Sequence, residues 1–287
     1  MKKIFLVLAA ALTSATLAFA QDYNEVVEAY NKGAEAIENK DIETALACFQ
    51  EAYAKGAEME EAAEIVATCK EQIPVLSYNL AVRDYNDKLY VDCIAKCEAA
   101  IALAEQFGNA DKAKEGKDLL ADARYFSAKD LEDTDIEAAK EALKALAENG
   151  EPRAAGRMAF LLSKDATDLQ KEAQALQDAA AKKEAFQKVY ELAKESIAYE
   201  ESAAAYKTLA TAARNIDNWE EAVLGYEKYL ELKPEAKDAI SITNNLAMCY
   251  EKVGDKVKAL ENYKKVAESD NEKLKAKAAK KVEALSK

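Results

Sequence analysis

The fold is decided by residues 203–236, which read AAAYKTLATAARNIDNWEEAVLGYEKYLELKPEA. The first half of this stretch carries apolar side chains at the i, i+3, i+4 and i+7 spacing of one helix face, at Tyr206, Leu209, Ala210 and Ala213. A turn follows at 215–218, where Asn218 is placed to cap a second helix and Glu221 completes a capping box. Pro234 closes the second helix, because proline cannot continue one. The stretch therefore predicts two helices joined by a tight turn.

A small residue returns at the same place in this pattern along most of the chain. The intervals between its occurrences are 48, 45, 47, 37 and 37 residues, from Ala45 through Cys93, Ala138, Ala185 and Ala222 to Ala259. Recurrence of this length is typical of stacked helical hairpins. Only three prolines and eight glycines interrupt the chain, and no alternating β-branched run predicts a strand. We therefore expect an all-α repeat protein.

The residues of the 203–236 unit resemble the tetratricopeptide repeat (TPR) family. The resemblance lies in a large residue, Leu-Ala, a small residue, a second alanine, an aromatic residue and a closing proline at the family's offsets. The pattern returns at 240–273, 26–59 and 74–107, and it is weaker around Ala138 and Ala185. Membership of this family implies a right-handed α-solenoid and a role as adaptor, assembly factor or chaperone-like binder.

The change in interval predicts how the repeats are organised. Intervals of 45–48 residues leave room for a third helix after each pair, and the candidates are 57–72, a stretch near 109–121, and 152–163. We therefore predict an N-terminal array of extended three-helix repeats over 21–163 and a two-helix array over 164–270. The last segment, 271–287, is predicted to be a basic capping helix.

The first 20 residues have the features of a cleaved signal peptide. Lys2 and Lys3 precede a nine-residue apolar run, and Ala18-Phe19-Ala20 gives a small-x-small cleavage site before Gln21. A retained membrane anchor is the weaker alternative, because nine helical residues cannot cross about 30 Å of hydrocarbon. We expect Sec-type export, cleavage after Ala20 and a periplasmic protein of a Gram-negative cell, with secretion as the alternative.

Composition argues against several classes of function. The formal net charge of −13 disfavours nucleic acid as a partner. The chain has no histidine, no phosphate-cradling glycine loop and no complete set of metal ligands, so we predict no enzyme activity, no cofactor and no metal. The number of cysteines, five, is odd, and most lie in apolar helix positions, including the i, i+4 pair Cys93 and Cys97. We interpret them as packing residues rather than disulfides or half a metal site.

The resemblance implies that the first helix of each hairpin lines a concave groove. In the first two units this places Tyr30, Tyr78, Val82 and Tyr85 in a stripe of aromatic and apolar side chains suited to a partner protein or peptide. The alternative is that the extra helices cover this stripe and make it core. The corresponding C-terminal positions are polar, at Lys207, Arg214, Asn244 and the neighbouring Asn245. Some family members hold a peptide carboxylate with such residues, and ordinary solvated polarity is the other interpretation.

The C-terminal segment adds a final candidate surface. Residues 271–287 contain six lysines against two glutamates, which suits weak contact with an anionic surface or a solvated cap. Together these features predict a non-catalytic protein-interaction scaffold of the bacterial envelope, without a transmembrane segment in the mature chain. The alternative function is a periplasmic small-molecule or glycan binder with a pocket between the solenoid halves.

Overall fold

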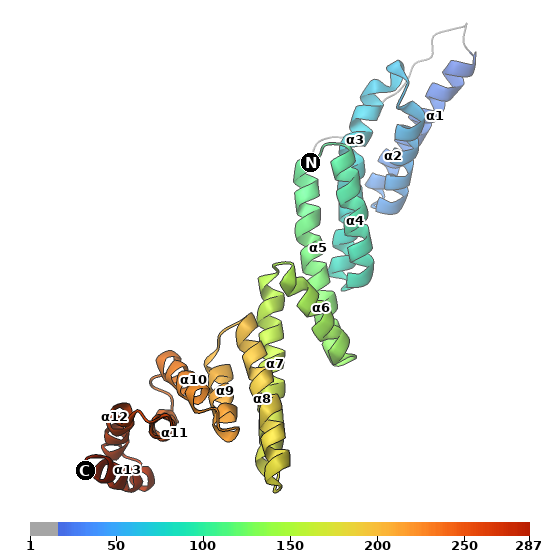
Figure 1. Ribbon diagram of the computed structural model, residues 1–287. Coiled ribbons are helices and arrows are strands. Elements are labelled where there is room, and N and C mark those ends of the chain that lie inside the picture. The colour runs from blue at the N-terminus through green and yellow to red at the C-terminus, as the bar shows by residue number, and fades with distance from the viewer. Residues whose placement is uncertain (1–16) are drawn as a thin grey trace. The chain divides into compact units, whose positions relative to one another are not determined.

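The computed structural model describes residues 17–287, and this part of the chain is all-α, as predicted (Figure 1). The signal-peptide prediction for 1–20 falls mostly outside the described residues, and export stays a prediction. No helix among residues 17–287 is both long and apolar enough to cross a membrane. The helices of this described part follow one another without strands between them: α1 (Leu17–Glu38), α2 (Ile42–Gly56), α3 (Ala63–Asn86), α4 (Tyr90–Gln106), α5 (Ala110–Asp130), α6 (Ile136–Glu148), α7 (Pro152–Ala175), α8 (Ala179–Tyr199), α9 (Ala203–Asn215), α10 (Trp219–Leu232), α11 (Ala239–Val253), α12 (Lys256–Ala267) and α13 (Glu272–Leu285), with short 3-10 turns at Glu60–Ala62 and Leu131–Asp133.

Packing runs mainly between consecutive helices, as expected for stacked hairpins. The chain divides into two compact units, Met1–Ala139 and Lys140–Lys287, and the division falls inside α6. The predicted boundary at 163/164 lies instead in the middle of α7. In the first unit α1 to α5 pack in order, and in the second unit α7 to α13 do the same. The predicted cap at 271–287 is α13, which packs on α12 and α11.

Residues 17–287 contain no separate third helices, and this corrects the prediction for 57–72, 109–121 and 152–163. Those segments are instead the N-terminal parts of long first helices, α3, α5 and α7, which have 24, 21 and 24 residues against 13 in α9 and 15 in α11. Pro74 misled the prediction, because it lies inside α3 and does not end it. A fixed φ near −65° suits a helix, so a proline in mid-helix removes a hydrogen bond without always stopping the chain. Longer helices, not additional ones, account for the long intervals.

The second helix of each hairpin begins at a comparable cap residue. Side-chain oxygens accept hydrogen bonds from backbone N–H groups three residues on, and the acceptors are Asp41, Asp135, Asp178, Asn218 and Asp255. Each of these bonds satisfies a donor that the helix itself leaves unpaired. Leu89 occupies the same place before α4 and makes no such bond. The predicted cap at Asn218 is therefore confirmed.

Counting from the cap gives a better register than the recurring alanines. The residue eight positions after the cap is fully buried in all six second helices, at Phe49, Cys97, Leu143, Phe186, Tyr226 and Tyr263. The small residue four positions after the cap is buried in five of them: Ala45, Cys93, Ala139, Ala222 and Ala259. Ala138 and Ala185 are only partly buried, so the predicted packing role belongs to Ala139 and Phe186 in those two hairpins.

The hairpin turns share a second feature. The residue immediately before the cap adopts a left-handed conformation at Lys40, Lys88, Asp217 and Gly254, with φ of 62°, 60°, 66° and 86°. Only glycine adopts this conformation without a steric penalty. The close approach of helices within a hairpin also depends on glycine. A Cβ at Gly225 of α10 would lie 2.9 Å from the Cβ of Ala210 and 3.0 Å from the carbonyl oxygen of Tyr206, both in α9.

Candidate functional site

Tyr30, the first residue of the predicted N-terminal stripe, does not lie in an open groove. Tyr30 of α1 is only 4% exposed, and its ring packs edge-on against Phe49 of α2, with centroids 5.4 Å apart. Burial raises the pKa of the Tyr30 phenol. Tyr30 is therefore a core residue, and its assignment as a partner-binding side chain is corrected. Tyr30 is buried because its ring packs against the fully buried Phe49 of the same hairpin.

The other residues of the stripe lie on α3 and are half-buried beneath α5. The Nζ of Lys112 in α5 lies 4.8 Å from the centroid of the Tyr78 ring. Tyr85 contacts Phe126 of α5 at 6.1 Å and Tyr90 of α4 at 5.6 Å, both edge-on. Val82, between the two tyrosines on α3, is half-buried as well. The long helix α5 packs against Tyr78 and Tyr85, so the stripe is half-buried rather than open, which is closer to the alternative in which other helices cover it.

The predicted C-terminal positions form part of a hydrogen-bonded network. Lys207 of α9 makes an ion pair with Asp238, with Nζ and Oδ2 2.5 Å apart, and the hydroxyl of Tyr229 in α10 donates to the other oxygen of Asp238 at 2.6 Å. Lys207, and then Tyr229, lowers the pKa of Asp238, and the bond to Asp238 raises the pKa of Tyr229 to about 12. Lys207 is thus engaged in joining consecutive hairpins. A carboxylate clamp built on it would have to displace Asp238.

The remaining predicted residues lie nearby on the same helices and are half-buried. Burial raises the pKa of the Tyr226 phenol. The Arg214 guanidinium of α9 and the Asn245 amide of α11 offset part of this rise. The side-chain nitrogen of Asn244 lies 3.7 Å from the sulfur of Met248, one turn further along α11. Within residues 17–287 Arg214 has no ion-pair partner. These side chains form a polar surface, and only Arg214 among them keeps an uncompensated charge.

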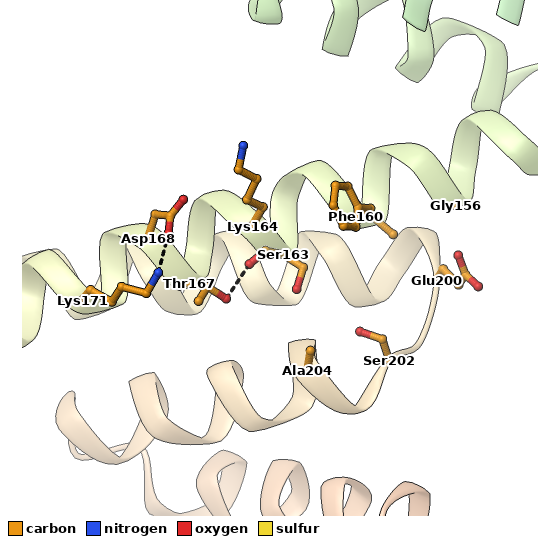
Figure 2. A pocket seen from close by; sticks show the side chains of 11 residues that line it. Gly156, Phe160, Ser163, Lys164, Thr167, Asp168, Lys171, Glu200, Ser202 and Ala204 are labelled. Atoms are coloured by element: carbon orange, nitrogen blue, oxygen red, sulfur yellow. Dashed lines mark hydrogen bonds and ion pairs between the residues drawn. The ribbon is translucent and has the colours of Figure 1, made fainter. Parts of the chain in front are cut away.

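An open groove lies instead between α7 and α9 of the second unit (Figure 2). Its volume is about 570 Å³. One wall is a face of α7, the opposite wall is the start of α9, and the segment between α8 and α9 closes one end. Eleven residues line it: Gly156, Ala159, Phe160, Ser163, Lys164, Thr167, Asp168, Lys171, Glu200, Ser202 and Ala204. Both walls are first helices of their hairpins, the helices that the family resemblance assigns to the groove.

The most prominent side chain in the groove is Phe160. It is 55% exposed, which is unusual for so large an apolar side chain, and the Arg157 guanidinium lies 4.8 Å from its ring centroid. A flat, solvent-exposed aromatic ring in a concavity is a typical anchor point for an apolar side chain of a partner.

The ends of the groove differ in charge. At one end the Glu200 carboxylate lies against the α7 backbone, so that a Cβ at Gly156 would come within 2.8 Å of its Oε2. At the other end Lys171 pairs with Asp168 at 2.8 Å, and this pairing lowers the pKa of Asp168. Lys164 also lines the groove, and its side chain projects from α7 away from α9 (Figure 2). The hydroxyl oxygen of Ser202 accepts a hydrogen bond from the Ala205 backbone and so fixes the start of α9.

Sequence reasoning missed this groove, although a signal was present. Arg157, Phe160, Lys164 and Lys171 follow the i, i+3, i+7 and i+14 spacing of one helix face. The prediction placed a short third helix over 152–163 and ended the array at 163, which cut this stripe in two. A continuous α7 restores it.

The cysteines do not add a second site. Cys93 and Cys97 lie one turn apart on α4 with their sulfurs 3.8 Å apart, and both are fully buried. Burial raises the pKa of Cys97 to about 12, which keeps that thiol protonated and unreactive. Among the described residues no cluster of three or more Cys, Asp or Glu side chains is arranged to hold a metal ion.

The chain is thus a stack of TPR-type helical hairpins. No family model and no curated protein sequence matches it. Similar solved structures include the TPR2AB-domain:pHSP90 complex of yeast Sti1, 14% identical over 92% of this chain and 99% of that chain, with a TM-score of 0.43. A thermophilic TPR protein of Thermus thermophilus is 16% identical over 73% of this chain and 98% of its own, with a TM-score of 0.33. A TPR protein of Parabacteroides merdae is 13% identical over 93% and 100%, with a TM-score of 0.29. Likeness at this level carries no argument about binding.

Proposed function

We propose that this protein is a non-catalytic interaction scaffold that binds a segment of a partner protein in the groove between α7 and α9. The observation that carries the proposal is Phe160, an exposed aromatic side chain inside a concave surface built from two first helices. The groove is open along its length and lacks the closed, water-excluding shape that chemistry requires. Its role is therefore binding rather than catalysis.

The groove suits an extended or helical segment rather than a small ligand. Phe160 lies one turn along α7 from Gly156, toward the end where Glu200 lies, and its ring offers an apolar contact there (Figure 2). A segment with one apolar side chain on the ring and polar groups on both sides would meet complementary partners in each place. Such a segment orders few side chains of the scaffold on binding, because α7 and α9 are already packed on α8.

Site-specific crosslinking in cells tests this proposal. A photoreactive phenylalanine at position 160 should crosslink to a defined partner, and the crosslinked residues should map to one segment of it. The matched control is Leu224 of α10, which is 56% exposed, close to the value for Phe160, and does not line the groove. Equal crosslinking from both positions to the same proteins would show that the groove is not the binding site.

A second variant separates binding in the groove from non-specific binding elsewhere on the surface. Gly156→Leu would place a side chain where Glu200 now lies against α7, and so would fill one end of the groove. We expect it to abolish the crosslink from position 160 without changing helix content in circular dichroism. A crosslink of unchanged yield would contradict a partner seated along the groove.

We also propose that the scaffold acts in the bacterial periplasm. Support comes from the signal-peptide features of residues 1–20 and from the acidic composition of the chain. Cell fractionation followed by N-terminal sequencing tests it, and the expected product begins at Gln21. Recovery of an uncleaved chain in the cytosolic fraction would overturn the export proposal and leave the groove proposal in place.

A further inference from the structure

The two ends of the chain carry opposite charges. Residues 22–64 contain twelve acidic residues against three lysines, and residues 271–287 contain six lysines against two glutamates. The net charge of −13 for the whole chain makes the basic C-terminal end a local exception. Opposite charges on the first and last helices of a repeat protein are a basis for recognition between copies.

The acidic end has a hollow on α1. Its volume is about 570 Å³, and it is lined along one face of the helix by residues that include Glu28, Asn31, Glu35 and Glu38. Glu28 is paired with Lys32 at 2.8 Å, whereas Glu35 and Glu38 are exposed and make no ion pair among the described residues. The Oδ1 of Asn31 has no hydrogen-bond donor, but it is buried and closed to a docking partner. The exposed carboxylates of Glu35 and Glu38 are therefore what this surface offers to a cationic partner.

The basic end presents a matching stripe on α13. The apolar face of this helix, centred on the buried Ala278, packs against α12. Lys273, Lys277 and Lys280 lie on the opposite face, are exposed and make no ion pair within residues 17–287. We call these three residues the lysine stripe. The three cations therefore recur along one exposed face of a regular helix.

The spacings of the two surfaces agree. The lysine stripe has the i, i+4 and i+7 spacing, and Asn31, Glu35 and Glu38 on α1 have the same spacing in the same direction. At a rise of about 1.5 Å per residue, both sets extend about 10.5 Å along their helices. With the two helices parallel, Lys277 and Lys280 face Glu35 and Glu38, and Lys273 lies at the edge of the contact beside Asn31. The two exposed carboxylates that make no ion pair among the described residues then each receive a cation.

We propose that copies of this chain assemble head to tail, with the lysine stripe of one copy docked in the α1 hollow of the next. The interface is heterologous, so it produces rings or open filaments rather than a two-fold dimer. A second copy is favoured over an anionic lipid surface because the complementary acidic surface is present on the same chain. The inference is independent of the groove between α7 and α9.

Sedimentation velocity on the purified chain tests the proposal. We expect the sedimentation coefficient to rise with concentration at about 0.15 M salt, where the Debye length of about 8 Å screens long-range repulsion. At about 1 M salt, where the Debye length is about 3 Å, the association should weaken. A triple substitution, Lys273→Glu, Lys277→Glu and Lys280→Glu, should lower the association constant roughly tenfold or more.

A charge exchange provides the decisive control. Glu35→Lys with Glu38→Lys should also abolish association, and combining these two substitutions with the triple substitution in one chain should restore it. All affected side chains are exposed, so thermal unfolding by circular dichroism should stay unchanged in each variant. Phe160→Ala should associate like the unsubstituted chain, which keeps this test separate from the groove.

Three results would overturn the proposal. They are a chain that stays monomeric up to high concentration at both salt levels, association that the triple substitution does not weaken, and failure of the combined variant to recover association. A fourth result assigns the lysine stripe to another partner: a monomeric chain that binds phosphatidylglycerol vesicles through these lysines would replace self-assembly by a lipid surface.

Discussion

The hairpin α9–α10 and the hairpin α3–α4 place different side chains at the same position. Eight residues after the cap, α10 has Tyr226 and α4 has Cys97, and both are fully buried. The C-terminal hairpins fill the space between helices with large aromatic rings, and tyrosines join the α9–α10 hairpin to α11, as Tyr250 of α11 does by donating to Glu227 of α10. The α3–α4 hairpin packs through Ala81, Cys93 and Cys97. One architecture thus tolerates two kinds of core.

The α3–α4 hairpin also buries a charge, which the α9–α10 hairpin does not. Asp84 of α3 is 2% exposed and is paired with Lys96 of α4, and the Nε of Arg83 lies 3.7 Å from its other oxygen. Small side chains bring the two helices close, and the ion pair satisfies the buried carboxylate between them. The difference teaches that the repeat requires a filled and satisfied interior at this position, not a particular residue.

The largest expected difference between the two hairpins concerns the residue eight positions after the cap. Tyr226→Ala should lower the free energy of unfolding by about 3–5 kcal/mol, because it removes a fully buried aromatic ring and leaves a cavity. Cys97→Ala should cost only about 1 kcal/mol, because it removes a single sulfur atom. Urea unfolding followed by circular dichroism measures both. Similar losses at the two positions would show that the two cores are equally dependent on volume.

A second expected difference concerns close approach. Gly225→Ala should destabilise the chain by about 1–3 kcal/mol, because its Cβ would meet the backbone and Cβ of α9 at 3.0 Å and 2.9 Å, and the backbone cannot move aside. In α5, a Cβ at Gly116 would lie 2.8 Å from Cγ1 of Ile101, whose χ1 is restricted because isoleucine is β-branched. We expect Gly116→Ala to cost less than Gly225→Ala, about 1 kcal/mol, because the contact is to a side chain rather than to backbone and alanine also favours the helix. A destabilised Gly116→Ala with a neutral Gly225→Ala would reverse the comparison.

Acid should loosen the C-terminal hairpins. Lys207, followed by Tyr229, lowers the pKa of Asp238, and Lys281 lowers the pKa of Glu251. A carboxyl group whose pKa is lower in the folded state contributes stability above its unfolded pKa of about 4, and this contribution is lost as the pH falls through the folded value. The single tryptophan, Trp219 in α10, reports locally on this region.

We therefore expect the fluorescence of Trp219 to change between about pH 5 and pH 2, ahead of the loss of helical circular dichroism. Asp238→Asn should remove part of this change, because the amide cannot titrate. Coincident fluorescence and helix transitions at all pH values would contradict a C-terminal region that opens separately.

The smallest expected effect lies in the turns. Asp217 and Lys88 adopt the left-handed conformation at the place where the α11–α12 turn already has Gly254. Asp217→Gly and Lys88→Gly should each raise the free energy of unfolding by about 0.5 kcal/mol, because relief of the steric penalty slightly exceeds the added chain entropy of glycine. Thermal unfolding with a Gly108→Ala control, at another left-handed position, should show the opposite sign. Loss of stability in both glycine variants would indicate that side-chain contacts hold these turns.

The sequence predicted the repeat architecture well and the site poorly, and the residues show why. Around Ala222 and Ala259 the apolar spacing that marks a helix face is set by residues close together in the sequence, so spacing alone was sufficient to find the helices. Pro74 and the long intervals were ambiguous, because spacing does not distinguish one long helix from two short ones. Tyr30 and Tyr85 were assigned to a groove from their helix face, but whether a face is open depends on helices such as α5 that pack over it. Phe160 was missed because its segment was assigned to a short third helix, whereas its face of the continuous α7 is open.

The buried thiols of α4 have a consequence for the order of events during biogenesis. Five free cysteines in an oxidising compartment, such as the one we propose, are exposed to mispairing for as long as the chain is unfolded. Nearly all contacts in this protein join neighbouring helices, and proteins dominated by local contacts fold within microseconds to milliseconds, whereas disulfides form over seconds to hours. We expect each hairpin to enclose its thiols as it folds, so that Cys93 and Cys97 are withdrawn from oxidation as soon as α3 and α4 pack together.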